Sequence, residues 1–373
     1  MITKNRVLSL ILTVLLLLGS FQTVPAEPVQ AASASGFQID FINVGQGDAS
    51  LIQCDGHYML IDGGSNKQSS LIYSYLKQRS ISYIDVMVAS HADADHIGGL
   101  SGALNYARIG TAYCSVTQAD TKTFKSFEKY LAAQGKSITV PAAGDTFDLG
   151  SAKVTVLGPV KASSNDNNSS LVLRIVYGNT SFLFTGDAET EEEESIINSG
   201  CQLESTVLKV AHHGSKSSSG YRFLREVSPQ YAVISVGKDN SYGHPTEDVL
   251  SRLRDADVKI YRTDMQGHII CTSDGNTVSF EPQKNADADT LAGAGAGQKS
   301  NKTISAAVES SEQAVQNTAP QEETYVLNTN TKKFHHPNCK SVNQMKDKNK
   351  EIFTGSRDDV IARGYVPCKN CNP

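Results

Sequence analysis

The order of apolar and polar residues divides positions 36–283 into short segments that predict strands and helices in alternation. Apolar runs bounded by turn-forming residues predict strands at residues 37–44, 50–54, 58–61, 84–89, 137–140, 152–157, 170–177, 181–185, 206–211, 231–235, 258–262, 268–272 and 277–280. Apolar side chains at helical spacing predict helices at residues 69–78, 123–134, 189–198, 221–227 and 246–255. Because strands and helices recur in two similar halves, we expect a layered α/β fold with the sheets inside.

The periodic pattern stops after residue 283 and is replaced by a segment rich in Ala, Gly, Ser, Asn, Gln and Glu. A segment of this composition cannot bury a core, so residues 284–322 are predicted to be a flexible linker. A small module of residues 323–373 follows. The chain of 373 residues is thus expected to hold one large and one small domain.

The N-terminus carries the pattern of a secretory signal peptide. Lys4 and Arg6 precede an apolar run at residues 7–19, and small residues follow at 31–34, so cleavage is expected after Ala31 or Ala34. An uncleaved membrane anchor is the alternative, although the apolar run is short for a membrane span. With residues 1–34 as the signal peptide, we expect a secreted or cell-surface protein.

Overall composition adds little to this interpretation. Charged residues make up 20% of the chain and apolar residues 39%, which is ordinary for a globular protein. The formal net charge of −5 does not indicate a nucleic-acid or membrane partner for the chain as a whole.

The stretch 90–99 places two histidines and two aspartates directly after the apolar run 84–89. These residues are His91, Asp93, Asp95 and His96. Charge at the end of a buried strand is costly without compensation, and a divalent metal prefers imidazole and carboxylate ligands. A polar loop that happens to be rich in His and Asp is the alternative.

Two further predicted strands also end in residues that can bind metals. Asp187 follows the run 181–185, and His212 and His213 follow the run 206–211. Side chains at neighbouring strand ends can converge on one edge of a rigid sheet. The three strand ends together therefore predict a metal site.

At this point the sequence resembles the metallo-β-lactamase superfamily, whose members carry a histidine- and aspartate-rich motif after a strand. The resemblance covers residues 36–283. More narrowly, the chain is similar to the hydrolase domain of ComEC-type DNA-uptake proteins, without their channel-forming membrane segments. The motifs that carry this likeness lie at residues 43–49, 60–64, 90–100, 182–187, 209–215 and 242–245.

The resemblance implies an αββα sandwich with two divalent metal ions, zinc or manganese, on one edge. His91 and Asp93 would hold the first ion, Asp95 and His96 the second, and Asp187 would bridge them. One of His212 and His213 would complete the second site, and the other would face the substrate. Asp62 would hold a ligand imidazole in its tautomer.

The chain departs from the superfamily pattern at two places. The usual histidine between the 90–99 motif and Asp187 has no clear counterpart, and residues 165–170 offer the polar candidates for the third ligand of the first metal, unless water supplies it. Asp93 stands where histidine is common, which favours harder metals such as manganese. For these reasons we do not expect β-lactam hydrolysis.

We interpret the main domain as a hydrolase of phosphodiesters in extracellular DNA. Two metal ions polarise a phosphoryl oxygen and activate water, and a cation is then needed near the developing charge. Lys209, Lys216 and His244 are the candidates, although each lysine has an alternative as a surface residue. A wall-polymer phosphocholine esterase, a lactonase, or a non-catalytic surface protein that binds DNA are the other hypotheses.

The C-terminal module contains residues with the spacing of a structural zinc site, namely His335, Cys339, Cys368 and Cys371. A module this small buries little surface, so a zinc ion would stabilise it. The arrangement resembles the zinc-binding module of Ada-type DNA-repair proteins. A disulfide involving Cys368 is the alternative, and the pairing of the four scattered cysteines, Cys54, Cys114, Cys201 and Cys271, stays open.

Charge distinguishes this module from the rest of the chain. From residue 325 onward, nine basic residues face four acidic ones. Such an excess can bind phosphates, although a solvated basic surface is the alternative. We therefore expect the module to bind nucleic acid, without repair chemistry of its own.

Overall fold

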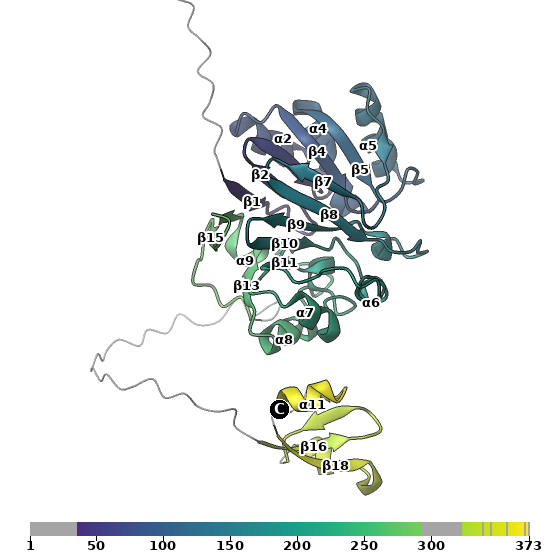
Figure 1. Cartoon of the computed structure of the whole chain (residues 1–373), viewed down its shortest axis with the longest axis vertical. Helices are drawn as coiled ribbons and strands as arrows, with labels where there is room; N and C mark the ends of the chain where they lie inside the picture. The colour runs from purple at the N-terminus through teal and green to yellow at the C-terminus, as the bar shows by residue number, and fades with distance from the viewer. Residues whose placement is uncertain are drawn as a thin grey trace, which may run out of the picture. The chain divides into compact units, whose positions relative to one another are not determined.

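The computed structural model describes residues 36–292, 323–337, 339–343, 345–355, 357–368 and 371, which form two compact units within Met1–Ser300 and Asn301–Pro373 (Figure 1). The expected signal peptide, residues 1–34, lies outside the described residues, as does most of the expected linker. Residues 284–292 of that linker lie against the larger unit, where Thr290 donates a hydrogen bond to the carbonyl oxygen of Ile260 at 2.9 Å. Among the described residues, no helix has both the length and the apolar character that crossing a membrane requires.

The larger unit contains two β-sheets. The first has the strand order β15-β14-β1-β2-β3-β4-β5-β6. Its strands are β1 (Phe37–Phe41), β2 (Ser50–Cys54), β3 (His57–Ile61), β4 (Tyr83–Ala89), β5 (Arg108–Cys114), β6 (Ile138–Thr139), β14 (Ile269–Ser273) and β15 (Val278–Pro282). The second sheet has the order β13-β12-β11-β10-β9-β8-β7. Its strands are β7 (Thr146–Leu149), β8 (Ala152–Gly158), β9 (Val172–Tyr177), β10 (Thr180–Phe184), β11 (Val207–Lys209), β12 (Tyr231–Ile234) and β13 (Lys259–Arg262).

Helices connect these strands. The α-helices of the larger unit are α2 (Ser69–Gln78), α3 (Ala94–Ile97), α4 (Leu100–Tyr106), α5 (Lys122–Ala133), α6 (Thr190–Asn198), α7 (Tyr221–Val227), α8 (Glu247–Asp255) and α9 (Thr263–Gln266). Short 3-10 helices lie at Asn66–Gln68, Asn167–Ser169 and Ala211–Gly214.

Three separate hydrophobic clusters show how the layers pack. The first lies between the two sheets and includes Phe41 from β1 and Phe184 from β10, whose rings stack. The second joins the outer face of the first sheet to α2, α4 and α5, and the third joins the outer face of the second sheet to α6, α7 and α8. Three clusters separate four layers, so the fold is the αββα sandwich that the motifs implied (Figure 1).

Parallel pairing determines where the functional residues lie. Strands β3, β4 and β5 run parallel in the first sheet, and β10, β11, β12 and β13 run parallel in the second. Within each parallel set, the carboxyl ends lie at the same edge. The motifs predicted to bind metal all follow such ends, so the topology brings them to one region.

The smaller unit is a four-stranded sheet with the order β18-β16-β17-β19. Its elements are β16 (Glu323–Asn328), β17 (Lys333–His335), α10 (Lys340–Asn343), a 3-10 helix (Asp347–Asn349), β18 (Lys350–Gly355), α11 (Arg357–Ala362) and β19 (Val366–Pro367). Tyr325, Leu327, Phe334, Val360 and Tyr365 form its small core.

Candidate metal centre

Buried imidazoles and a buried carboxylate converge where β4, β10 and β11 end. His91 and His96 follow β4, Asp187 follows β10 and His213 follows β11, and all four side chains are almost fully buried. His96 Nε2 lies 3.2 Å from Asp187 Oδ1, and His213 Nε2 lies 3.6 Å from Asp187 Oδ2. Asp187 therefore sits between the histidines, as the expected bridging position requires.

The atoms at the centre of this cluster have no hydrogen-bond partner among the described residues. They are His91 Nε2, His96 Nε2, His213 Nε2 and Asp187 Oδ1. A buried polar atom without a partner costs about 1–3 kcal/mol, so four in one place need compensation. Two groups of residues each bring three donor atoms together, His91–His96–Asp187 and Asp95–His96–His213. Within each group the three donor atoms lie within 4.8 Å of one another. This arrangement fits divalent metal ions.

The opposite ring nitrogens of two histidines are held by the protein. His96 Nδ1 lies 2.9 Å from Asp62 Oδ2, and Asp62 in turn accepts hydrogen bonds from the backbone N–H and the hydroxyl of Ser90 at 2.8 and 2.7 Å. His91 Nδ1 lies 3.1 Å from the Ser90 hydroxyl and 3.3 Å from the Ser170 hydroxyl. Such contacts orient metal ligands and determine which nitrogen is available.

The backbone around Asp62 is fitted closely to the 90–99 motif. Asp62 has a φ of 57°, in the left-handed region that aspartate tolerates better than most residues. A Cβ atom at Gly99 would collide with the carbonyl oxygen of Gly63. Gly99 is therefore needed for the close approach of the two segments.

His213 is held by a buried ion pair. Its Nδ1 lies 3.0 Å from the carbonyl oxygen of Ser235 and 3.2 Å from Asp48 Oδ1, while Asp48 Oδ2 pairs with Lys209 Nζ at 2.7 Å. Burial opposes ionisation of Asp48, but Lys209 and His213 lower its pKa to about 2. Burial would also lower the pKa of His213, yet Asp187 and Asp48 raise it to about 10. The carboxylates thus create a strongly negative field, which suits a cation.

Asp93 and Asp95 approach the same cluster from the start of α3. Asp93 Oδ2 lies 3.6 Å from His91 Nε2, and Asp95 Oδ2 lies 3.5 Å from His213 Nε2. The nearby His91 imidazole is the main reason that the pKa of Asp93 is lowered. Both carboxylates therefore face the unpartnered nitrogens in their charged form.

His212 and His213 point in different directions although they are adjacent. His212 is 22% exposed, and its ring nitrogens lie 3.8 Å from Asp187 Oδ2 and 3.3 Å from Glu189 Oε1. It belongs to neither of the two donor groups, whereas His213 belongs to one. The geometry therefore favours His213 as the ligand and His212 as the residue on the open side.

Residues 165–170, the polar candidates for the third ligand of the first metal, make contacts behind the donor atoms. The Ser170 hydroxyl contacts His91 Nδ1 and accepts a hydrogen bond from the backbone N–H of Asp187 at 3.0 Å. Asn168 Oδ1 accepts from the backbone N–H of Glu189 at 2.9 Å. Sequence reasoning placed this segment near the metal but missed the orienting roles of Ser90 and Ser170, because serine carries no distinctive spacing signal.

The three candidate cations differ in their surroundings. Lys209 is buried against Asp48 and does not reach the surface. Lys216 is exposed on the segment that follows His213. His244 is buried beside His212, with ring centroids 5.6 Å apart. Burial and the neighbouring His212 lower the pKa of His244 to about 4. His244 is therefore neutral at pH 7, where its N–H can donate a hydrogen bond.

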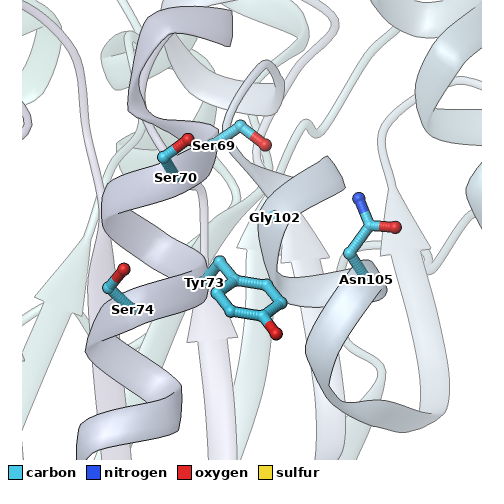
Figure 2. A pocket seen from close by; sticks show the side chains of 6 residues that line it. All are labelled: Ser69, Ser70, Tyr73, Ser74, Gly102 and Asn105. Carbon is cyan, nitrogen blue, oxygen red and sulfur yellow. The ribbon is translucent and has the colours of Figure 1, made fainter.

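A hollow of about 520 Å³ on the outer helical layer is separate from this chemistry (Figure 2). It is lined by Ser69, Ser70, Tyr73, Ser74, Gly102 and Asn105. This lining contains no carboxylate, imidazole or thiol, so the hollow offers neither a metal site nor a strong base.

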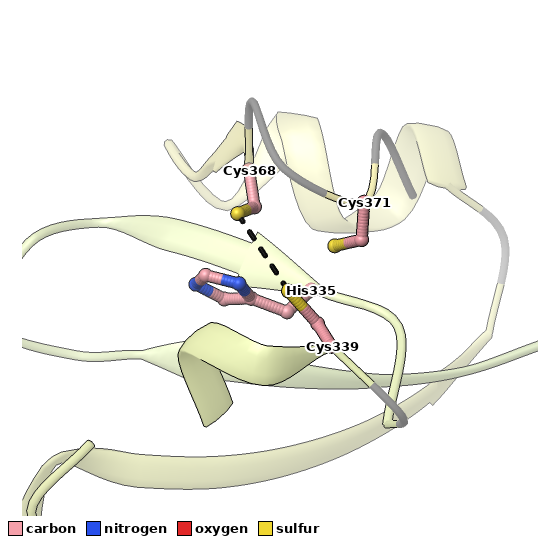
Figure 3. Close-up of side chains that lie close together, drawn as sticks. All are labelled: His335, Cys339, Cys368 and Cys371. Atoms are coloured by element: carbon pink, nitrogen blue, oxygen red, sulfur yellow. Dashed lines mark hydrogen bonds between the residues drawn. The ribbon is translucent and has the colours of Figure 1, made fainter. Parts of the chain in front are cut away.

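Four candidate zinc ligands lie together in the smaller unit (Figure 3). One donor atom from each of His335, Cys339, Cys368 and Cys371 lies within 4.8 Å of the others. Burial opposes ionisation of Cys339, but hydrogen bonds from His335 and Cys371 lower its thiol pKa to about 6. A thiolate beside an imidazole and two further sulfurs fits the donor set of a structural zinc ion.

No disulfide joins any of the seven cysteines, each of which is among the described residues. The two sulfurs that the disulfide alternative would join, Cys339 Sγ and Cys368 Sγ, lie 4.0 Å apart.

Comparison with known proteins places these features in context. The family described as Metallo-beta-lactamase superfamily matches residues 42–238. The chain is 32% identical over 254 residues to ComE operon protein 3 of Bacillus subtilis, covering 62% of this chain and 32% of that protein. It is 34% identical over 256 residues to competence protein ComA of Neisseria gonorrhoeae, covering 68% and 34%. The chain thus spans about a third of the length of these curated relatives.

A solved structure, the metallo-beta-lactamase fold protein YhfI from Bacillus subtilis, matches with a TM-score of 0.43 and 14% identity, covering 66% of this chain and 100% of that one. The family match and the curated relatives confirm the predicted resemblance to the superfamily and to ComEC-type proteins.

Proposed function

The chain belongs to the metallo-beta-lactamase superfamily, and we propose that it is a metal-dependent hydrolase that cleaves phosphodiester bonds in extracellular DNA. The observation that carries this proposal is the set of buried donor atoms without partners, His91 Nε2, His96 Nε2, His213 Nε2 and Asp187 Oδ1. Two divalent ions bound there would supply Lewis acidity and activate water for hydrolysis.

The chain's own residues keep this centre in one geometry. Asp62 holds His96, and Asp48 with Lys209 holds His213. Asp187 is central to the cluster and accepts no hydrogen bond at Oδ1. Preorganised ligands need no rearrangement when substrate binds, which favours catalysis.

Three features favour a phosphate ester over other substrates. Asp93 and Asp95 add hard carboxylate donors, which suit manganese or magnesium. The buried, neutral His244 can donate a hydrogen bond to a phosphoryl oxygen on the open side, next to His212. One of the relatives is named a competence protein, which supports DNA as the polymer.

We further propose that the protein is secreted, that a structural zinc ion stabilises its smaller unit, and that this unit binds nucleic acid. The basic excess from residue 325 onward supports phosphate binding. Several of these side chains, including Lys333, Lys340, Lys346 and Lys348, are exposed on the smaller unit.

A cleavage assay tests the proposal. Purified protein is incubated with single-stranded and double-stranded DNA in the presence of manganese, and we expect cleavage that is lost in His96→Ala. His57→Ala is the matched control, because His57 is exposed at the opposite end of β3 from Asp62. Absence of cleavage by the unsubstituted protein, or equal cleavage by His96→Ala, contradicts the proposal. Hydrolysis of phosphocholine esters or lactones instead would favour the alternative hydrolases.

A further inference from the structure

Tyr242 presents an exposed aromatic ring on the loop of residues 237–245. The side chain is 67% exposed although it is large and partly apolar. Singly exposed apolar residues are common on protein surfaces, so exposure alone carries no conclusion. The position of the ring relative to the candidate metal centre is what distinguishes it.

A row of rings connects Tyr242 to the candidate metal centre. The Tyr242 ring stacks on His244, with centroids 5.7 Å apart and an interplanar angle of 27°. His244 packs edge-on against His212 at 5.6 Å, and His212 Nε2 lies 3.8 Å from Asp187 Oδ2. Tyr242 is therefore separated from the donor cluster by two imidazole rings, on the side that His212 leaves open.

The loop holds Tyr242 in a defined position. Asn240 makes four hydrogen bonds within it: its Nδ2 donates to the carbonyl oxygens of Gly237 and His244, and its Oδ1 accepts from the backbone N–H groups of Tyr242 and His244. Gln46 Oε1 also accepts from the backbone N–H of Gly237 at 3.1 Å, which ties the loop to the β1–β2 connection. Because the loop is already ordered, binding of a ligand to the ring costs little conformational entropy.

Exposed lysines beside the loop favour an anionic ligand. Lys238 lies on the same loop, next to the exposed Asp239, and Lys216 lies on the segment after His213; both lysines are exposed. Neither forms an ion pair within the part of the chain that the structure describes. The two ammonium groups outnumber the single carboxylate of Asp239, so these three side chains attract a phosphate more than a cationic headgroup such as choline, which would otherwise suit an aromatic ring.

We propose that Tyr242 forms a nucleobase subsite, in which a base next to the scissile phosphate stacks on the exposed face of the ring. This inference rests on the proposed phosphodiesterase function and names its substrate as nucleotidic. Stacking on an aromatic ring is tolerant of sequence, because every base has a flat face. The enzyme would therefore prefer unpaired bases over paired ones, with little sequence preference.

The test compares a single-stranded oligodeoxynucleotide with a matched oligomer of the same length whose sugars lack bases. Binding is measured by fluorescence anisotropy in the Asp187→Asn background, so that the oligomers stay intact. We expect the base-containing oligomer to bind more tightly, and Tyr242→Ala to reduce this preference by roughly five- to 150-fold. Tyr242→Phe should retain the preference.

Tyr83→Ala is the matched control, because Tyr83 is 51% exposed at the start of β4, the end opposite the His91 motif. It should leave the preference unchanged. A preference that survives Tyr242→Ala, or that Tyr83→Ala removes to the same extent, overturns the proposal. So does equal binding of the two oligomers by the parent protein. Because binding is read without cleavage, failure of the hydrolase proposal shows separately, as an uncleaved substrate in the manganese assay.

Discussion

Replacing Lys209 with methionine tests whether the ion pair behind His213 is structural. Lys209 Nζ lies 2.7 Å from Asp48 Oδ2, and both side chains are almost fully buried. Removing one partner of a buried pair leaves an uncompensated charge, which costs about 3–5 kcal/mol. Because His213 still contacts the other oxygen of Asp48, we expect a loss near the lower end, about 3 kcal/mol of unfolding free energy.

The pKa of Asp48 determines how this loss of stability changes with pH. Lys209 and His213 lower the pKa of Asp48 to about 2 from an ordinary value of 3.8. Its stabilising contribution is therefore complete above pH 3.8 and is lost as the pH falls through about 2. In Lys209→Met the carboxylate loses its ammonium partner and keeps only its contact with His213. The stability difference from the parent protein should therefore be largest at neutral pH and should shrink as acid protonates Asp48.

Equilibrium unfolding in urea, followed by circular dichroism at pH 7 and in mild acid, measures both effects. The double variant Asp48→Asn, Lys209→Met removes both charges and should recover most of the lost stability. Metal affinity, measured by calorimetry, should fall about 10- to 100-fold in the single variant, because Asp48, which contacts His213 Nδ1, is no longer held in place by Lys209. A single variant within 1 kcal/mol of the parent, or a double variant no more stable than the single, would refute the reasoning.

Two further changes address other parts of the chain. Glu192 is buried and accepts a hydrogen bond from the backbone N–H of Val160, and burial raises its pKa to about 7 from 4.5. Between pH 4.5 and about 7, Glu192 keeps its proton in the folded protein and loses it in the unfolded chain. The free energy of unfolding therefore falls as the pH rises through this range, by up to about 1.4 kcal/mol per pH unit. Glu192→Gln should flatten this dependence in urea unfolding at pH 5 and 7, and an unchanged slope would contradict the assignment. In the smaller unit, Cys371→Ser should abolish zinc binding and make residues 323–373 sensitive to protease. Cys201→Ser, which lies outside the cluster, is the control and should have neither effect. Unaltered zinc content in Cys371→Ser would show that the cluster is not a zinc site.

Much of the fold could be predicted from the sequence because local patterns were strong. The bounds predicted for α2 and α7 match Ser69–Gln78 and Tyr221–Val227, and the hairpin of β9 and β10 forms around the predicted turn. The sequence did not single out β5 or β7. β7 is a short strand at the edge of its sheet, so its residues are partly exposed and carry no clear alternation. The first strand was predicted to end at residue 44 but ends at Phe41, because the chain turns towards Asp48.

The site was less predictable than the fold, because its decisive contacts join distant parts of the chain. Histidine and aspartate at strand ends indicated the donors, but nothing in the pattern showed that Lys209 would be buried against Asp48. The role of Ser170 behind His91 likewise depends on two sheets packing together. Short-range patterns carry information about elements, whereas these contacts depend on how the elements meet.

The choice between His212 and His213 depends on backbone conformation, which also links the metal centre to the Tyr242 loop. Both histidines have positive φ angles, 49° and 52°, a conformation that costs about 1–3 kcal/mol per residue and persists only where surrounding contacts enforce it. Ser235 and Asp48 hold His213 inward, and His212 lies beside Glu189. A regular helix or strand would not turn two successive imidazoles in this way. The strained turn therefore delivers one imidazole to the buried donors and the other to the open side, where it meets His244 and, through it, the ring of Tyr242.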